Sequence, residues 1–276
     1  MMAWTEITRA RYCRAGLRYA SDLTDEEWRL VEPFMPVRNR LGRPRSRSLR
    51  MIMNAILYML STGCQWRQIP REFGPFTTIQ SYFYRWSRDS TLVQINRALT
   101  IMARENANRA PHPTAGVIDS QSVKTTEAGG PRGFDVGKKI KGRKRHIITD
   151  TLGHLVGIDV RPANIQDRDG APRVIKAIRS RYPLLRHLFA DATYAGPKLA
   201  KKLIRLGKWT LEIVKRSEFA KGFELLSRRW VVERTFARLG QCRRLAKDFE
   251  ATIQSATAWI LLAHIRLLTR RIAQQC

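Results

Sequence analysis

Two short apolar segments, residues 115–119 and 187–191, constrain the fold of this chain most, and each of them ends in an aspartate. Short apolar runs bounded by polar or turn residues are typical of buried strands. Residues 145–150 and 154–160 predict two further strands, joined as a hairpin by residues 151–153. Helices are predicted at 171–180, 197–206 and 225–247, and a last strand at 210–214. The order βββαβαβα predicts a three-layer α/β domain.

The two strand-ending aspartates, Asp119 and Asp191, carry the chemical prediction. Ligands in α/β sheets bind beyond the strand ends, so the two carboxylates meet if their strands are neighbours. Carboxylates that share a site repel one another, and a divalent cation relieves this repulsion. Oxygen ligands alone favour Mg²⁺ or Mn²⁺. Two such ions, about 3.5–4 Å apart, support in-line displacement at a phosphodiester. The alternative is that each aspartate only caps a turn.

A third carboxylate is expected, and the later acids offer several choices. They are Glu212, Glu218, Glu224, Glu233, Asp248 and Glu250. Helical spacing favours Glu233, which shares a face with Trp230 and Ala237 and is predicted to point inward. Arg229 lies one turn earlier and would keep Glu233 ionised. An ion pair of Arg229 with Glu233 and no further role is the alternative. The opposite face, with Arg234, Arg238, Gln241 and Arg244, is suited to phosphates.

The charge balance indicates a polyanionic partner. The chain has 51 Lys and Arg against 23 Asp and Glu, a net charge of +28. Nucleic acid is favoured over a membrane surface, because no lipidation signal or basic amphipathic anchor is present. Every basic residue before Lys124 is an arginine, and two prolines follow Ala110. We therefore expect a basic lead at 1–20, a helical domain at 21–110, a catalytic domain at 111–250 and a C-terminal helix packed on it at 251–276.

The N-terminal region predicts four short helices. Thr24–Glu27 is a capping box, Ser48 and Thr91 begin further helices, and Thr77 or Thr78 is expected to cap the third. In the third helix, Gln80 and Arg85 are expected to point outward. In a helix-turn-helix-like module, outward side chains of this kind contact bases in the major groove. An ordinary exposed polar face is an equal alternative.

Other classes of protein are disfavoured. The four cysteines, Cys13, Cys64, Cys242 and Cys276, form no C-x-x-C pair, which fits a reducing cytosol rather than a zinc module or disulfide scaffold. The N-terminus has no apolar core of a signal peptide. The apolar stretch 256–268 is interrupted by His264 and Arg266, so it predicts a packed helix and not a membrane span.

A basic run precedes the predicted hairpin. Its members are Lys138, Lys139, Lys141, Arg143, Lys144 and Arg145. Contact with the DNA backbone is favoured over a solvated loop, since the run lies next to the expected phosphodiester site. Asp167 and Asp169 precede a helix and are expected to be caps, with contact to metal or DNA as the alternative. Asp150 and Asp159 are expected on the exterior of their strands.

Several motifs together resemble bacterial insertion-sequence transposases of the DDE type, in the IS-five group. They are Ser21–Trp28, Thr62–Trp66, Ile118–Lys124, Gly137–His146, Asn164–Ala171, Phe189–Gly196 and Arg228–Phe236. The resemblance covers nearly the whole chain and implies a ribonuclease-H-like (retroviral-integrase-like) catalytic fold. It implies that Asp119, Asp191 and Glu233 are the catalytic acids and metal ligands, with Arg229 as the family's arginine four residues before the glutamate.

The chain departs from the family pattern at a few positions. Ala192-Thr193 replaces the usual two glycines, Gly240 stands where related groups often carry a basic residue, and Arg238 replaces a tryptophan. Arg243 and Arg244 follow Gly240 within one turn and are expected, with Arg229 and Arg234, to contact DNA.

The resemblance implies a transposase that binds its terminal inverted repeats. Mg²⁺ or Mn²⁺, as two ions, would activate water to cut the DNA, and the freed 3′-hydroxyl would attack target DNA, without a covalent protein nucleophile. The expected partners are double-stranded DNA and further copies of the chain, in a homodimer or larger synaptic assembly at the bacterial nucleoid. A ribonuclease-H-like structure-specific nuclease and a catalytically inactive DNA-binding protein are the alternatives.

Overall fold

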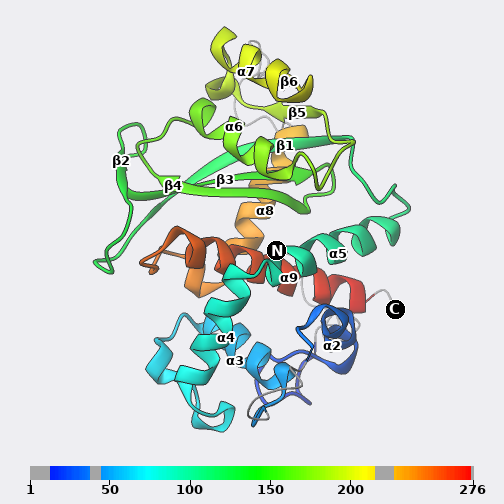
Figure 1. The fold of residues 1–276 in the computed structure, drawn as a ribbon, viewed down its shortest axis with the longest axis vertical. Coiled ribbons are helices and arrows are strands. Elements are labelled where there is room, and N and C mark those ends of the chain that lie inside the picture. The colour runs from blue at the N-terminus through cyan, green and yellow to red at the C-terminus, as the bar shows by residue number, and fades with distance from the viewer. Residues whose placement is uncertain (1–12, 38–44, 215–226, 275–276) are drawn as a thin grey trace.

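The computed structural model describes residues 13–37, 45–214 and 227–274. Glu218 and Glu224, two of the acids considered above, and Cys276 lie outside them. The N-terminal part is helical: α2 Asp25–Val31, α3 Leu49–Thr62, α4 Phe76–Arg88 and α5 Thr91–Glu105, with single-turn 3₁₀ helices at Glu32–Phe34, Trp66–Gln68 and Arg71–Phe73. Figure 1 shows α2, α3 and α4 together at one end of the molecule and the sheet at the other.

Local sequence signals explain most of these helix starts. Thr24 forms the predicted capping box with Glu27, and the Ser48 hydroxyl accepts the Met51 N–H at 3.2 Å. The third start was predicted wrongly: α4 begins at Phe76 directly after Pro75, before Thr77 and Thr78. Residues 63–75 separate α3 from α4, which is much longer than the three- or four-residue turn of a helix-turn-helix unit.

A six-stranded mixed sheet forms the other part. Its strands are β1 Ala115–Lys124, β2 Gly133–Asp135, β3 Ile140–Asp150, β4 Leu155–Pro162, β5 His187–Ala190 and β6 Thr210–Ile213. The strand order is β2-β3-β1-β5-β6, with β4 also paired to β3. The predicted hairpin is confirmed, because β3 and β4 pair antiparallel through a turn in which Gly153 has a φ of 90°.

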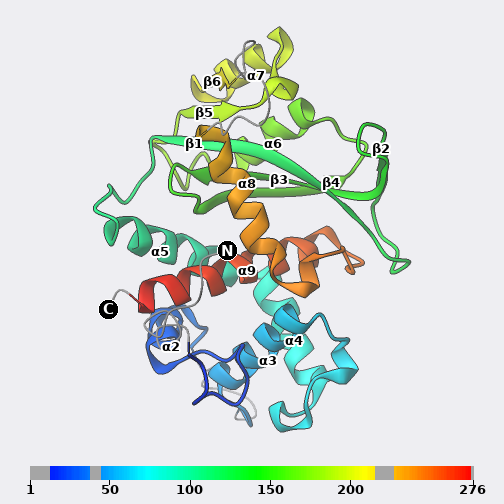
Figure 2. The same cartoon turned by 180° about the vertical axis from the view of Figure 1, so that it is seen from behind.

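Helices cover both faces of the sheet, as the βαβα pattern predicts. On one face, α6 Asp167–Ile178 and α7 Pro197–Gly207 bury Ile118, Ile148 and Leu188 of the strands. On the other face, α8 Ser227–Gly240 and α9 Ile253–Ala273 pack with Val117 and Ile147. Figure 2 shows α8 crossing this second face. The predicted helix 225–247 is too long: α8 ends at Gly240, and a 3₁₀ turn at Arg243–Leu245 follows.

Helix α9 lies between the sheet and the N-terminal helices (Figure 1). It packs on α2, α3, α4 and α5 as well as on α8 and β4, and one apolar core continues through all of them. Phe83 of α4 stacks on Trp259 of α9 with ring centroids 4.4 Å apart. The C-terminal helix therefore belongs to the helical part at least as much as to the sheet.

Buried polar contacts join α5 and α9 to the β3–β4 hairpin. The His264 ring contacts Asn96 Oδ1 at 2.6 Å and accepts the Leu155 N–H at 3.0 Å. Arg104 of α5 forms a 2.6 Å ion pair with Asp150, which is fully buried and also contacts His154. The prediction that Asp150 lies on the exterior of its strand is therefore wrong. Among the described helices, none combines the length and the hydropathy that a membrane crossing requires.

Candidate active site

The strand register brings Asp119 and Asp191 to the same level. Strands β1 and β5 are parallel neighbours in which Val117 pairs with Phe189, so two residues further on Asp119 stands opposite Asp191. Asp119 Oδ1 accepts the Ser120 N–H at 2.7 Å. Asp191 lies just past β5 and caps the 3₁₀ turn Ala192–Tyr194, with its Oδ1 accepting the Thr193 N–H at 2.9 Å. The two strands are thus neighbours, the condition under which the two carboxylates were expected to meet. The predicted strand end at Asp119 is wrong, because β1 continues to Lys124.

Burial dominates the electrostatics of Asp119. Burial, together with the nearby charge of Asp191, raises the pKa of Asp119 to about 6, although the Ser120 N–H and the charges of Lys138 and Arg229 act in the opposite direction. Tyr194 is buried beside the same acids. Burial, followed by the charges of Asp119, Asp167 and Asp191, raises the pKa of Tyr194 well above the usual value. Two carboxylates in such surroundings favour a cation between them.

Arg229 lies between Glu233 and Asp191 and connects the two acids. The Arg229 Nη2 lies 3.4 Å from Glu233 Oε1 and 4.0 Å from Asp191 Oδ2. The face of α8 was predicted wrongly, since Trp230, Glu233 and Ala237 are exposed. The buried face of α8 consists of Val232, Thr235, Phe236 and Leu239. Glu233 is therefore exposed and not directed into the core, and Arg229 lies between it and Asp191.

The other described candidates for a third acid have partners elsewhere. Glu212 Oε2 contacts the His187 ring at 3.1 Å. Asp248 pairs with the fully buried Arg143 at 3.0 Å, and Glu250 pairs with Arg244. Glu233 is thus the one of the four described candidates that shares an arginine with Asp191.

The donor set consists of carboxylate oxygens, as a Mg²⁺ or Mn²⁺ site requires. Within residues 13–37, 45–214 and 227–274, no three His, Cys, Asp or Glu side chains are close enough together to hold one ion. Arg229 occupies the space between Asp191 and Glu233. The residues fit a cation at the Asp119–Asp191 pair, and Glu233 would join it only if Arg229 moved.

Asp167 contacts residues next to both acids of the pair, and the prediction that it caps a helix is wrong, because Asp167 is the first residue of α6 and Gln166 is the N-cap residue. Its Oδ1 accepts the Ser120 hydroxyl at 2.7 Å and lies 2.9 Å from Lys144 Nζ. Its Oδ2 is 3.4 Å from the Thr193 hydroxyl, which also makes a short hydrogen bond to Asp191. Thr193, one of the two departures from the family glycines, therefore links Asp191 to Asp167.

The basic run divides into exposed and buried members. Lys138, Lys139 and Lys141 are exposed. Arg143, Lys144 and Arg145 are buried: Arg143 pairs with Asp248, Lys144 with Asp135 and Asp167, and Arg145 donates to Leu245 O at 3.0 Å. The prediction of a DNA-contacting arm is wrong for these three, because β3 carries them into the protein and their charges are satisfied there.

The other predicted DNA contacts also separate by exposure. Arg244 is buried, pairs with Glu250 and stacks over Trp259, so its predicted contact with DNA is wrong. Arg234 is half-buried and donates to Leu152 O at 3.4 Å. Arg243 is exposed. On α4, Arg85 is exposed above the Tyr82 ring, as predicted, whereas Gln80 is half-buried.

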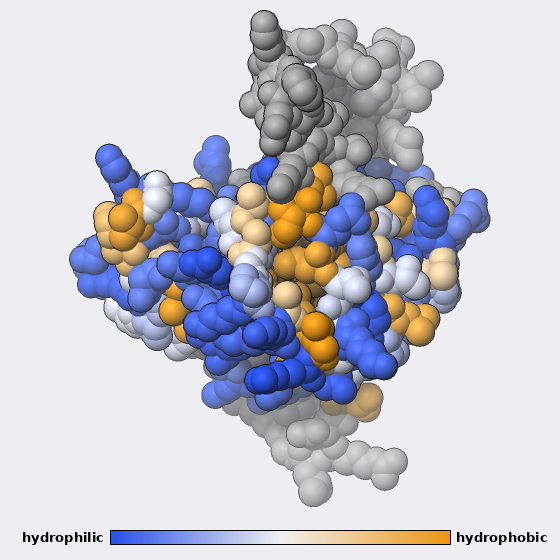
Figure 3. Space-filling view, turned by 90° about the horizontal axis from the view of Figure 1, so that it is seen from above, coloured by the Kyte–Doolittle hydropathy of each residue, from blue (hydrophilic) through white to orange (hydrophobic). Residues whose placement is uncertain are grey.

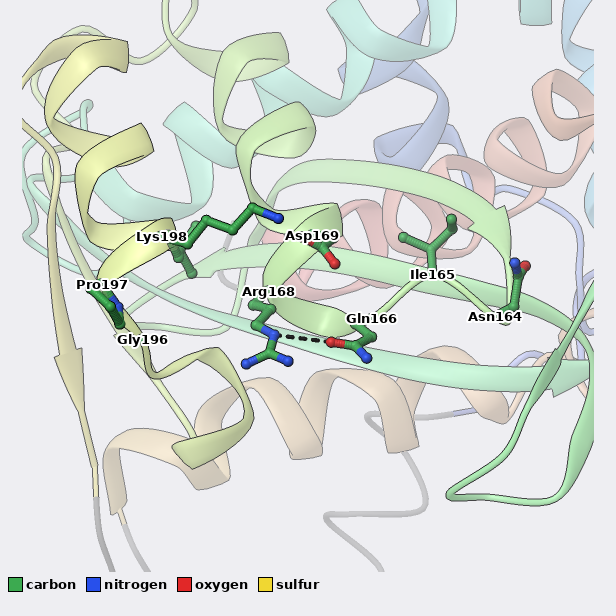
Figure 4. A pocket seen from close by; sticks show the side chains of 9 residues that line it. Asn164, Ile165, Gln166, Arg168, Asp169, Gly196, Pro197 and Lys198 are labelled. Atoms are coloured by element: carbon green, nitrogen blue, oxygen red, sulfur yellow. Dashed lines mark hydrogen bonds between the residues drawn. The ribbon is translucent and has the colours of Figure 1, made fainter.

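A cavity of about 560 Å³ lies between residues 164–169 and 196–199. Figure 4 shows it between the start of α6 and the start of α7, lined by Asn164, Gln166, Arg168, Asp169 and Lys198 among others. Arg168 donates to Gln166 Oε1 at 2.9 Å. The lining thus includes two basic side chains, Arg168 and Lys198, and one acidic side chain, Asp169.

Comparison with known proteins identifies the family. Residues 110–268 match the model described as "Transposase DDE domain", and residues 23–96 match "Putative transposase of IS4/5 family (DUF4096)". "Uncharacterized protein y4sN" from Sinorhizobium fredii is 28% identical over 83 residues, which is 30% of this chain and 64% of that protein. No solved structure matches. Asp119, Asp191 and Glu233 all lie in the first region, which spans more than half of the residues, and the chain belongs to the DDE transposases of the IS4/5 type.

Proposed function

We propose that this chain is a DNA transposase that binds the terminal inverted repeats of its own insertion sequence and catalyses metal-dependent strand cleavage and strand transfer. The observation that supports this most is the register of the parallel strands β1 and β5, which sets Asp119, within β1, level with Asp191, just past the end of β5. The antiparallel β3–β1 pair and the helix that carries Glu233 behind the sheet agree with a ribonuclease-H-like catalytic fold.

Asp119, Asp191 and Glu233 would hold Mg²⁺ or Mn²⁺, in one or two sites. Bound there, the cation would polarise a water or a 3′-hydroxyl and the scissile phosphate. The chain itself positions the acids: Ser120 N–H orients Asp119, and Thr193 orients Asp191. Arg229 is ion-paired with the acids at the site and would turn to the phosphate when the cation takes its place.

Exposed basic side chains around the site would bind the DNA backbone. Lys138, Lys139 and Lys141 lie on the hairpin of β2 and β3, and Arg243 follows α8. Arg85 and Gln80 on α4 are proposed to contact bases of the terminal repeat. Because both ends of the element must react together, we propose a homodimer or a larger synaptic assembly.

The test uses a supercoiled plasmid that carries this gene with its natural flanking DNA. We expect cleavage with Mg²⁺ at two matching inverted repeats, followed by joined products in a second plasmid, and no reaction in EDTA. Cleavage at the repeats without joined products would instead indicate a nuclease. Repeat binding without cleavage in either Mg²⁺ or Mn²⁺ would indicate a DNA-binding protein without activity.

A further inference from the structure

The hairpin formed by β2 and β3 has an apolar outer face. Phe134 is 50% exposed and Val136 is 77% exposed, although both are large apolar side chains. Phe134 pairs with Lys141 across the two strands, so these two side chains stand on the same face. Lys139 is also exposed, in the turn after Val136. Two apolar side chains are thus bordered by two lysines.

The inner face of the same hairpin is fixed to the sheet. Asp135 is buried, accepts the Ser122 hydroxyl at 2.6 Å and lies 3.3 Å from Lys144 Nζ. The Lys138 N–H donates to Asp135 Oδ1 at 3.0 Å, which closes the turn. With Asp135 tied inward, alternation along the strand holds Phe134 outward. The exposure of Phe134 therefore follows from the hairpin's own hydrogen bonds.

The hairpin also reaches the active site. Lys138 Nζ donates to Ser120 O at 3.4 Å, and the charge of Lys138 acts on Asp119. Figure 1 shows β2 at one side of the sheet, and in the view from above an apolar group lies at that edge among hydrophilic side chains (Figure 3). The turn that follows the apolar face is therefore next to β1 at the residue after Asp119.

We propose that this outer face contacts DNA, with Phe134 and Val136 inserted against the bases while Lys139 and Lys141 hold the flanking phosphates. The inference rests on the proposed function and adds a base-contacting surface to it. Apolar wedges between lysines or arginines are a physical solution for unstacking a base step, because the phosphate contacts compensate the loss of stacking. The lysines make a polyanion a better partner for this face than an apolar protein surface.

The test measures binding of full-length protein to a short mixed-sequence duplex in EDTA, at several salt concentrations. The double variant Phe134→Ser, Val136→Ser should bind at least about fivefold more weakly with an unchanged salt slope, since apolar contacts release no counterions. The double variant Lys139→Gln, Lys141→Gln should weaken binding. It should also flatten the slope of log affinity against log salt by roughly 0.9 for each phosphate that is no longer neutralised. Leu184→Ser, at a residue that is 55% exposed elsewhere, is the matched control.

A second measurement distinguishes insertion of the apolar side chains against the bases from binding that leaves the bases stacked. A duplex with 2-aminopurine should become brighter when wild-type protein binds and should stay dim with the double serine variant, because only an inserted side chain unstacks the probe. Equal affinity of the double variant and wild type would overturn the inference. So would a dimer that the double serine substitution turns into a monomer, which would make this face an interface between copies. Failure of strand transfer by wild-type protein would overturn the proposed function and leave this binding result standing.

Discussion

Thr193 is the residue that most directly determines how Asp191 is held. Its backbone N–H and its hydroxyl both donate to Asp191 Oδ1, and the hydroxyl also approaches Asp167. A hydroxyl has one proton, so it can serve only one of the two carboxylates at a time. A glycine at this position would keep the backbone contact and lose the link to Asp167.

Removing this hydroxyl should slow the reaction without unfolding the protein. Thr193→Val keeps the shape and loses one hydrogen bond to a charged group, which predicts a roughly tenfold lower cleavage rate. Thr193→Ser keeps the hydroxyl and should retain nearly the wild-type rate. Single-turnover cleavage and the half-saturating Mn²⁺ concentration, followed by electron paramagnetic resonance of the free ion, are the measurements. Equal rates for the valine and serine variants would show that the hydroxyl does not position Asp191.

The residues that form the candidate site could be predicted from the sequence only in part. Asp191 directly follows its apolar strand, as the sequence predicts, but Asp119 lies within β1, which continues to Lys124 because residues 120–124 pair with β3. The exposure of Glu233 was missed because α8 has apolar or small residues on two faces, and the spacing of Trp230 and Ala237 suggested the wrong one as buried. The support by Asp167 depends on contacts with Ser120 and Thr193, 47 and 26 residues away, which no local pattern contains.

At the scale of elements, the Arg104–Asp150 pair joins helix α5 to the β3–β4 hairpin. Burial of Asp150 raises its pKa, but the His154 and Arg104 contacts outweigh this and hold the pKa at about 2, below the usual 3.8. A lowered folded-state pKa means that the ionised pair stabilises the fold above pH 4. This contribution is lost as the pH falls from about 4 toward 2.

Asp150→Asn should therefore destabilise the protein in a pH-dependent way. At pH 7 the change leaves Arg104 buried without its counterion, which predicts a loss of about 3–5 kcal/mol in the free energy of unfolding. The difference from wild type should shrink as the pH falls below 4. Chemical unfolding at several pH values measures it, with Glu127→Gln, from the exposed pair with Arg132, as the control. A difference independent of pH would contradict the assigned pKa.

Element boundaries followed local chemistry where a cap or turn was present. Thr24, Ser48 and the β3–β4 turn behaved as predicted. The basic run did not, because its outcome depends on a partner far along the chain: Arg143 pairs with Asp248 after 105 residues. A charge run looks the same in sequence whether strand pairing buries its members or leaves them in solvent.

For the whole molecule, the shared apolar core makes the folding of the N-terminal helices depend on the C-terminal helix α9. Phe83 and Trp86 of α4 are buried in the same core as Trp259 and Leu262 of α9. Cutting the chain at residue 110 would expose these surfaces, although the prolines at 111 and 113 suggested a boundary there.

Residues 21–110 alone should thus fail to unfold cooperatively. Helices can form from local signals without α9, but the exposed apolar face should leave them loosely packed. Circular dichroism melting together with binding of an apolar dye measures this, with the full chain as the reference. A sharp transition near that of the full chain would show that the helical part is an independent domain.

The measurement that tests the central claim is cleavage by single variants of the three acids, on the plasmid with the natural flanking DNA. Asp119→Asn, Asp191→Asn and Glu233→Gln should each abolish cleavage and joining in Mg²⁺ while repeat binding in EDTA stays within about twofold, because each loses a metal ligand that contributes several kcal/mol to the transition state. Asp169→Asn, at an exposed acid on neighbouring α6, should stay active. Near-wild-type cleavage by any of the three would remove that residue from the active site.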